Sequence, residues 1–114
     1  MFASDPTQSV LEAAMRGASM RQTLLTNNLA NADTPGFQPK DVNFQSQLAS
    51  AISSGAPAAD VGFRAANDPS AAGATGVNAD QESAKLSENG LLFDALSQIL
   101  TAHDSILEYA MGTK

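Results

Sequence analysis

Apolar residues recur at helical spacing in the first third of the chain. Read in heptads, one position is apolar throughout, its neighbours on both sides are mostly apolar, and the opposite position is polar. The apolar position and its neighbours comprise Leu11, Ala18, Leu25, Ala32, Val10, Leu24, Met15 and Leu29. Asp5 can cap such a helix, Pro6 suits its first position, and Gln8 stands where a capping box needs a polar residue. The pattern predicts an amphipathic helix over about residues 6–32.

A turn ends this helix. Pro35 cannot continue the helical hydrogen bonding, and Gly36 tolerates the positive φ required at the third place of a type II turn. Residues 34–37, Thr-Pro-Gly-Phe, are therefore predicted to form that turn. We expect Asn28 and Asn31 to hydrogen-bond the carbonyls at the helix end or a neighbouring subunit.

The middle of the chain carries a weaker pattern. A short helix is predicted over 43–53, with Asp41 or Asn43 as its cap. Its apolar pair, Phe44 and Leu48, has two interpretations: one face of the short helix, or an element that another protein recognises. From residue 53 to 76 the only large apolar side chains are Val61 and Phe63, so this segment is predicted to be a linker or a loop ordered only in context.

The clearest periodicity lies near the C-terminus. Asn78 and Gln81 can open a helix that runs to about residue 111, before Gly112 at the C′ position. Its apolar lines comprise Leu86, Phe93, Leu100 and Leu107; Leu92, Ile99 and Ile106; and Asn89, Leu96, His103 and Ala110. The polar line is Ser87, Asp94, Thr101 and Glu108. Because a two-stranded seam needs only two apolar lines, a three-line face predicts contact with more than one neighbour.

These elements predict an all-α fold in which two long terminal helices pair as a coiled-coil-like hairpin. The expected parts are the first helix and turn (1–37), a short helix with a flexible middle segment (38–77), and the last helix (78–114), the two ends forming one structural domain. The residues expected to pack between helices are Leu11, Leu25, Leu29, Leu86, Phe93, Leu96, Leu100 and Leu107. Gly17 and Gly90, inside predicted helices, suggest close helix contacts.

Charge and composition narrow the function. The formal net charge is −6, which repels phosphate backbones and argues against nucleic-acid partners. Residues 58–114 carry three basic and eight acidic side chains, so a partner of this half is expected to be basic or neutral. The chain has no cysteine, no Sec-type signal and no apolar run long enough to span a membrane, so we expect no membrane insertion and, if the chain leaves the cytoplasm, another export route.

Candidate chemistry is poor. The consecutive residues His103, Asp104 and Ser105 point about 100° apart on a helix and cannot form a catalytic relay. A single imidazole offers too few ligands for zinc, so His103 is interpreted as a packing residue. Asp80 and Glu82 are better explained by the helix start than by calcium, and Asn89 by a role in setting the register of a seam. We expect no catalytic residue, metal or cofactor.

One run of residues resembles a known family. Residues 25–37, Leu-Thr-Asn-Asn-Leu-Ala-Asn-Ala-Asp-Thr-Pro-Gly-Phe, closely resemble the N-terminal signature of the bacterial flagellar rod and hook proteins. Residues 41–44, 77–82 and 88–93 are similar to proximal-rod members of that family. The residues carrying the signature are Asn28, Asn31, Thr34, Pro35, Gly36 and Phe37.

The resemblance implies a structural subunit of the proximal rod, in the periplasmic part of the basal body, that connects the MS ring to the distal rod and transmits torque. It implies export by the flagellar type III apparatus without a cleaved signal peptide, for which Phe44 and Leu48 resemble an export-gate motif. The implied partners are further copies of the chain, the rod proteins FlgC and FlgF, FliE, and the MS-ring protein FliF. The alternatives are another rod subunit such as FlgC, or an unrelated helical adaptor that binds a partner helix.

We predict that the isolated chain at low concentration is largely disordered or only transiently helical, because two helices and a long loop bury too little surface to offset chain entropy. Far-UV circular dichroism during heating is the measurement. A dilute monomer that melts sharply, with about half of its residues helical beforehand, would contradict this.

Overall fold

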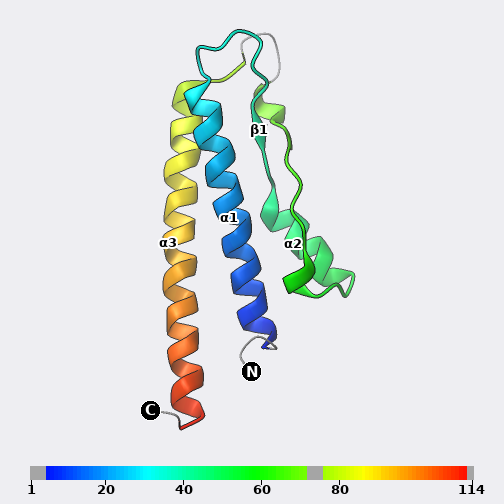
Figure 1. Ribbon diagram of the computed structural model, residues 1–114, viewed down its shortest axis with the longest axis vertical. Helices are drawn as coiled ribbons and strands as arrows, with labels where there is room; N and C mark the ends of the chain where they lie inside the picture. Colours follow the sequence, from blue (N-terminus) through cyan, green and yellow to red (C-terminus); the bar gives the residue numbers. More distant parts are fainter. Residues whose placement is uncertain (1–4, 72–75, 113–114) are drawn as a thin grey trace.

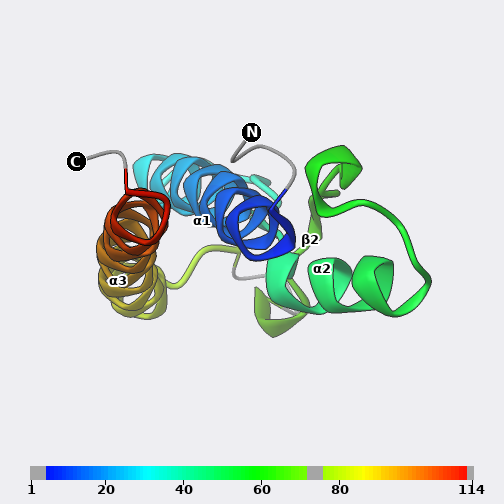
Figure 2. The same ribbon diagram turned by 90° about the horizontal axis from the view of Figure 1, so that it is seen from below.

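A computed structural model describes residues 5–71 and 76–112 of the chain. Its elements are α1 (Pro6–Ala30), β1 (Lys40–Asp41), α2 (Phe44–Ser53), η2 (Ala58–Asp60), β2 (Ala66–Asn67), η3 (Pro69–Ala71) and α3 (Ala79–Ala110). The helices α1 and α3 lie side by side and antiparallel (Figure 1). Seen along the helices, α2 flanks α1 on the other side (Figure 2). The predicted all-α fold with two long terminal helices is confirmed.

The first helix begins as predicted and ends earlier. Asp5 caps it by accepting a hydrogen bond from the Thr7 amide at 3.1 Å. The predicted capping box is wrong, because the Gln8 side chain donates to Glu12 at 3.0 Å. The helix ends at Ala30, two residues before the predicted end, because Asn31 is its C-cap and donates from its side chain to the Asn27 carbonyl at 2.9 Å. For Asn31, the expected bond to a helix-end carbonyl is therefore confirmed.

The turn after α1 has the predicted geometry. The Phe37 amide donates to the Thr34 carbonyl at 3.2 Å, and Gly36 has φ of 76°. The positive φ at the third place makes this a type II turn. No atom outside its chain neighbours lies within 4 Å of where a Cβ of Gly36 would stand, so backbone conformation alone calls for glycine here.

The other two helices have the predicted caps. The short helix α2 is capped by Asn43, which accepts from the Ser46 amide at 3.2 Å, and Asp41 takes no part in the cap. Asn78 caps α3 by accepting from the Gln81 amide at 3.1 Å. At the other end Gly112 has φ of 70°, as the C′ position requires.

The middle segment is more structured than predicted. β1 and β2 pair antiparallel, with Lys40 opposite Asn67 and Asp41 opposite Ala66. After α2 the chain packs back on α1: Ala58, Val61 and Phe63 join the apolar clusters there, and the Arg16 side chain donates to the Val61 carbonyl at 3.1 Å. The linker interpretation is therefore wrong up to Ala71. Residues 72–75 of the predicted flexible segment lie outside the described residues.

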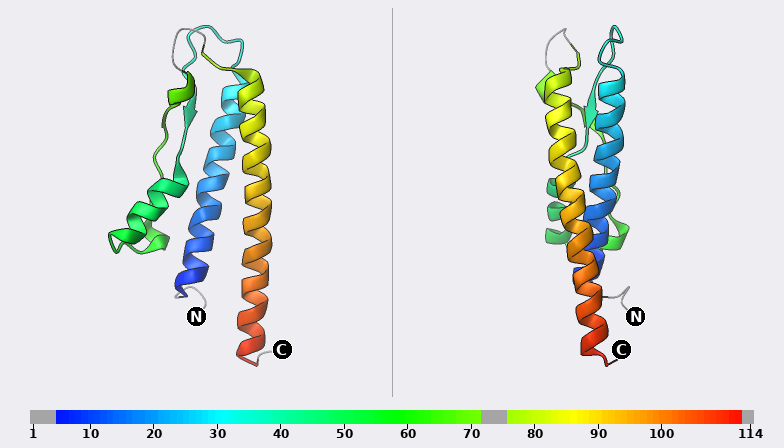
Figure 3. Two further views of the ribbon diagram at one scale, coloured as in Figure 1. Left: turned by 180° about the vertical axis from the view of Figure 1, so that it is seen from behind. Right: turned by 90° about the vertical axis from the view of Figure 1, so that its left-hand side faces the viewer.

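The core is thin and lies along α1. One cluster holds Ala13, Leu48 and Ala58, and the other holds Ala18, Val42 and Phe44. The molecule measures 58 × 29 × 14 Å, with a radius of gyration of 17.0 Å. A compact domain of this length would have a radius of gyration of about 13 Å. The protein is therefore an elongated slab whose interior is a set of helix contacts (Figure 3).

The two interior glycines differ. A Cβ on Gly17 would lie 2.5 Å from the Phe44 side chain, so the predicted close contact is confirmed. For Gly90 the prediction is wrong within the single chain, because nothing lies within 4 Å of the Cβ position. Within the described residues, none of the helices has the length and apolar character needed to cross a membrane.

We predict that Gly36→Val disturbs the turn without creating a steric clash. A β-branched residue at positive φ costs about 1–3 kcal/mol, so the turn would no longer fix the direction in which the chain leaves α1. Gly36→Asn is the matched control, because Asn tolerates this conformation. Under the role that the resemblance implies, the measurement is the amount of each variant recovered outside the cell and in purified basal bodies: the Gly36→Val chain should be exported but poorly incorporated, whereas the Gly36→Asn chain should be incorporated. Equal incorporation of both variants would show that the turn is a simple connector.

Candidate functional site

A line of residues on α3, spaced by seven, joins the two ends of the chain. Asn89 is 1% exposed, and its side-chain amide donates to the Ala18 carbonyl at 2.8 Å and to the Gln22 side chain at 2.9 Å. Buried polar groups must be paired, so these bonds hold α3 at one axial position on α1. The structure thus places Asn89 in the predicted seam; that it sets the register remains a prediction.

One heptad earlier, Glu82 is 2% exposed and accepts a hydrogen bond from the side-chain Nδ2 of Asn28 at 2.8 Å. The same side-chain Nδ2 of Asn28 donates to the backbone carbonyl of Lys40 at 2.7 Å. The side-chain Oδ1 of Asn28 accepts from the backbone amide of Lys40 at 3.1 Å. Asn28 therefore binds β1 and α3, and the expected bond to a helix-end carbonyl is wrong. Glu82 does more than favour a helix start, because it ties the first turn of α3 to the end of α1.

Two heptads after Asn89, the His103 Nε2 atom lies 2.7 Å from an Asp5 carboxylate oxygen. This hydrogen bond lowers the pKa of Asp5, which also caps α1. The interpretation of His103 as a packing residue is therefore incomplete, since the imidazole fastens the start of α1 to α3. Partners of the line run backwards along α1, from Asn28 to Gln22 to Asp5, as an antiparallel pair requires.

A charged network surrounds the Glu82 end of this line. Lys85 lies 2.6 Å from Asp68, 3.5 Å from Glu82 and 3.9 Å from Asp41. Arg21 forms two bonds with the Asp41 carboxylate, at 2.8 and 3.1 Å. The network therefore joins α1, β1, the segment after β2 and α3.

The pKa values record this pairing. Burial pushes the pKa of Asp68 up, but the Lys85 ammonium and the Ser70 donors outweigh it, and the pKa lies below its ordinary value. Burial lowers the pKa of Lys85, and the Asp68 carboxylate more than compensates, so it lies above its ordinary value. The hydrogen bond that Arg21 donates to the Asp41 carboxylate raises the pKa of Arg21.

The predicted packing residues are not equally buried. Leu25 has no exposed surface, whereas the other members are half-buried: Leu11, Leu29, Leu86, Phe93, Leu96, Leu100 and Leu107. Among the described residues, the exposed large apolar side chains are Ile52, Leu91, Ile99, Ile106, Tyr109 and Met111. Part of the three-line apolar face of α3 is thus exposed in the part of the chain that the structure describes.

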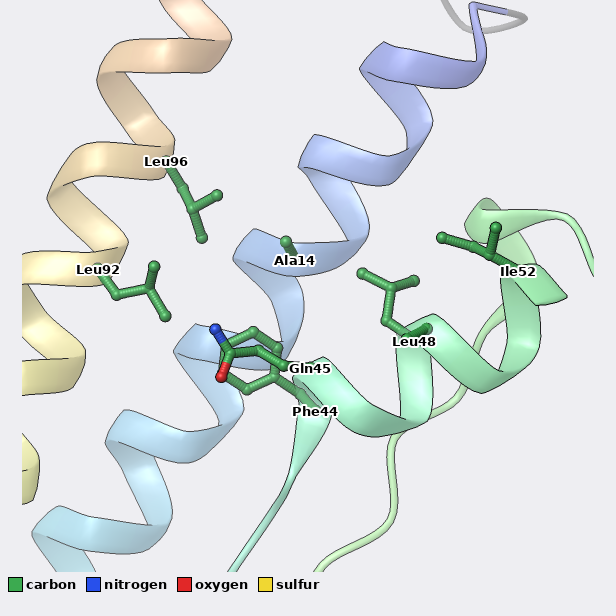
Figure 4. A pocket seen from close by; sticks show the side chains of 8 residues that line it. Ala14, Phe44, Gln45, Leu48, Ile52, Leu92 and Leu96 are labelled. Atoms are coloured by element: carbon green, nitrogen blue, oxygen red, sulfur yellow. The ribbon is translucent and has the colours of Figure 1, made fainter.

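An apolar groove lies between α2 and α3, with α1 as its floor (Figure 4). Its volume is about 230 Å³. Leu92 and Leu96 form the α3 wall, Ala14 the floor, and Leu48 and Ile52 the α2 wall. Phe44 and Leu48 are 3% and 7% exposed, so in the folded chain both belong mainly to the core.

The signature turn lies at the end of the hairpin. Thr34, Pro35 and Gly36 are exposed, and Phe37 is half-buried. The Thr34 hydroxyl donates to the Asn31 side chain at 3.0 Å, so these residues mainly stabilise one another. Asn28 is the signature residue that reaches into the interior.

Sequence reasoning missed most of the polar residues that connect the helices. Glu82 could have been found, because it continues the heptad line of Asn89 and His103 by one step. Arg21 and Lys85 carried no comparable signal, because their acidic partners come from loops and a strand far along the chain.

The arrangement can hold the two chain ends together and present apolar surface. Within 5–71 and 76–112, no group of three or more His, Cys, Asp or Glu residues could hold a metal ion. The fold and the site together define a helical structural subunit.

Comparison with known proteins specifies the class. The family model described as flagella basal body rod protein matches residues 10–38. The flagellar basal body rod protein FlgB of Yersinia ruckeri is 31% identical over 112 residues, covering 78% of this chain and 81% of the relative. FlgB of Yersinia enterocolitica is 31% identical (72% and 76% covered), and FlgB of Salmonella typhimurium is 32% identical (72% and 75% covered). The chain belongs to the flagellar basal body rod protein family and is a structural subunit of the flagellar rod.

We predict that Asp68→Asn destabilises the fold by about 1–3 kcal/mol at neutral pH, because Lys85 loses its nearest buried partner. Asp60→Asn, at an exposed carboxylate, should have little effect. The measurement is urea unfolding followed by circular dichroism, at a protein concentration that keeps the chain helical.

The pH dependence has a definite sign. The folded-state pKa of Asp68 is depressed, so its contribution is fully present above the ordinary value of 3.8 and is lost as the pH falls through the lowered value. The difference between the wild type and Asp68→Asn should therefore shrink in acid. A constant difference down to strongly acidic pH would contradict this assignment.

Proposed function

We propose that this subunit occupies the proximal rod, connects the MS ring to the distal rod and transmits torque. The relatives that support this are FlgB proteins matched over about three quarters of their length, and the observation that carries it is the seam between the two chain ends. Membership of the rod family excludes an unrelated adaptor. Another rod position, such as that of FlgC, is the alternative; the three relatives named above, all FlgB proteins, favour the proximal one.

The seam suits a load-bearing part. If α3 slid along α1 by one residue, Glu82 and Asn89 would lose their buried partners, and each unpaired group costs about 1–3 kcal/mol. An apolar seam alone would resist such sliding less. The charged network around Lys85 adds ties between α3 and the β1 side. The helix pair therefore suits a stiff strut along the long axis of the molecule.

The proposed partners are further copies of the chain, FlgC, FlgF, FliE and FliF. The charge of α3 restricts the surfaces it can meet: six acidic side chains and one basic one favour basic or neutral contacts. The proposal includes no catalytic residue and no cofactor.

Delivery to the periplasmic rod is proposed to use the flagellar type III apparatus, without a cleaved signal peptide. Phe44 and Leu48, the proposed export-gate motif, are almost fully buried in the fold. A receptor could therefore contact them only when α2 is released from α1. Under this proposal the motif is available in the unfolded chain and hidden once the subunit has folded.

The experiment is recovery of the chain in detergent-extracted hook–basal bodies, using α3 variants. Leu100→Asp and Leu107→Asp each place a charge at a half-buried seam position and should be exported but lost from the basal bodies, with loss of motility. Thr101→Asp, on the exposed polar line, is the matched control and should be incorporated. Absence of the wild-type chain from basal bodies, or equal incorporation of all three variants, would contradict the proposal.

A further inference from the structure

The described chain carries two unpartnered apolar surfaces. One is the groove of Leu92, Leu96, Ala14, Leu48 and Ile52. The other, here called the α3 stripe, consists of Ile99, Ile106 and Tyr109, which are 51%, 65% and 80% exposed. Exposed apolar surface of this kind marks an interaction site.

We propose that the groove of one copy receives the α3 stripe of a second copy. This rests on the proposed function, because it takes several copies to lie together in the rod. Among the described residues, every large exposed apolar side chain lies either on α3 and its cap or, as Ile52 does, in the groove wall. Within a second copy, the last turns of α3 are therefore the exposed apolar segment that can fill the groove.

The groove is open to such a helix. No Cα atom of α2 lies within 8 Å of a Cα atom of α3, so the two walls are separated, and between them lie Ala14 of α1 and the side chains of Phe44 and Gln45 (Figures 2 and 4). The last turns of α3 run past the start of α1, which leaves them accessible at the opposite end of the molecule from the turn (Figure 3).

Charge favours this pairing over contact between two stripes. Each α3 carries a net charge of −5, so two α3 stripes face to face would bring like charges together. In contrast, α1 carries one acidic and two basic side chains, and α2 carries none. A stripe seated in the groove meets α1 and α2 as well as Leu92 and Leu96 of the first α3, so part of its contact is with neutral to basic elements, whereas two stripes face to face would bring only acidic helices together.

The pairing joins different surfaces and need not close. Along α3 the stripe residues Ile99 and Ile106 lie roughly nine residues beyond Leu92 and Leu96, or about 13 Å at 1.5 Å per residue. Parallel copies joined in this way are displaced along the helix axis, and each keeps a free groove and a free stripe. Such a head-to-tail contact builds an open series of copies.

Disulfide trapping tests the pairing, because the chain has no cysteine of its own. The variant carries Ile52→Cys and Ile106→Cys, both at exposed positions, so the fold is little disturbed. These residues are too far apart for a bond within one chain, since α2 and α3 have no Cα atoms within 8 Å. The matched control carries Ile52→Cys with Thr101→Cys on the polar line.

Oxidised basal bodies should show a ladder of multiples of the 11.7 kDa chain for the Ile106 pair and none for the Thr101 pair. A product that stops at the dimer would overturn the open arrangement. A chain that is incorporated but not cross-linked, or that is linked to a protein of different mass, would overturn the pairing itself and leave the proposed function standing. Absence of the wild-type chain from basal bodies would instead count against the proposed function.

A second measurement needs no assembly in cells. Sedimentation of the concentrated full-length wild type should show association that Ile106→Glu abolishes and Thr101→Glu leaves intact. A wild type that stays monomeric, or an Ile106→Glu chain that associates as the wild type does, overturns the proposal.

Discussion

The arrangement of this molecule depends on the hydrogen bonds between buried polar groups of α1 and α3. Leucines in a seam can slide past one another at little cost, but a buried amide that loses its acceptor cannot. The bonds of Asn89 to α1 and of Glu82 to Asn28 would both be lost if the register or the direction of the hairpin changed. These bonds join α1 and α3 into a helix pair. The β1–β2 pair, α2 and the charged network around Lys85 are arranged around it.

Because the molecule is built around this helix pair, it is thin. With a short dimension of 14 Å, most side chains that face one neighbour also face solvent, and few large apolar residues are fully buried. Polar bonds supply the specificity that a deep core would otherwise supply by shape. The same thinness leaves apolar surface exposed on α3, since a slab cannot enclose a helix face that is three lines wide.

Much of this could be predicted from the sequence, because the information was local. The caps Asp5, Asn43 and Asn78 and the Gly36 turn depend on neighbouring residues, and the heptads of α3 predict the line of Asn89 and His103 that contacts the first helix and its cap. The contacts that could not be predicted join distant segments. Lys40 opposite Asn67, and Lys85 beside Asp68, require knowledge of how the middle segment returns to α1, which two-residue strands do not signal.

The first helix of the chain finds its partners in the last. The bonds that define the seam join residues 54, 71 and 98 positions apart in the sequence. Closing such long loops costs entropy before any contact repays it, so the topology folds slowly for a helical protein. A chain that emerges from any narrow passage with its N-terminus first cannot complete the seam until its final helix has followed. Under the proposed export route, the order of residues alone would therefore delay folding until delivery is nearly complete.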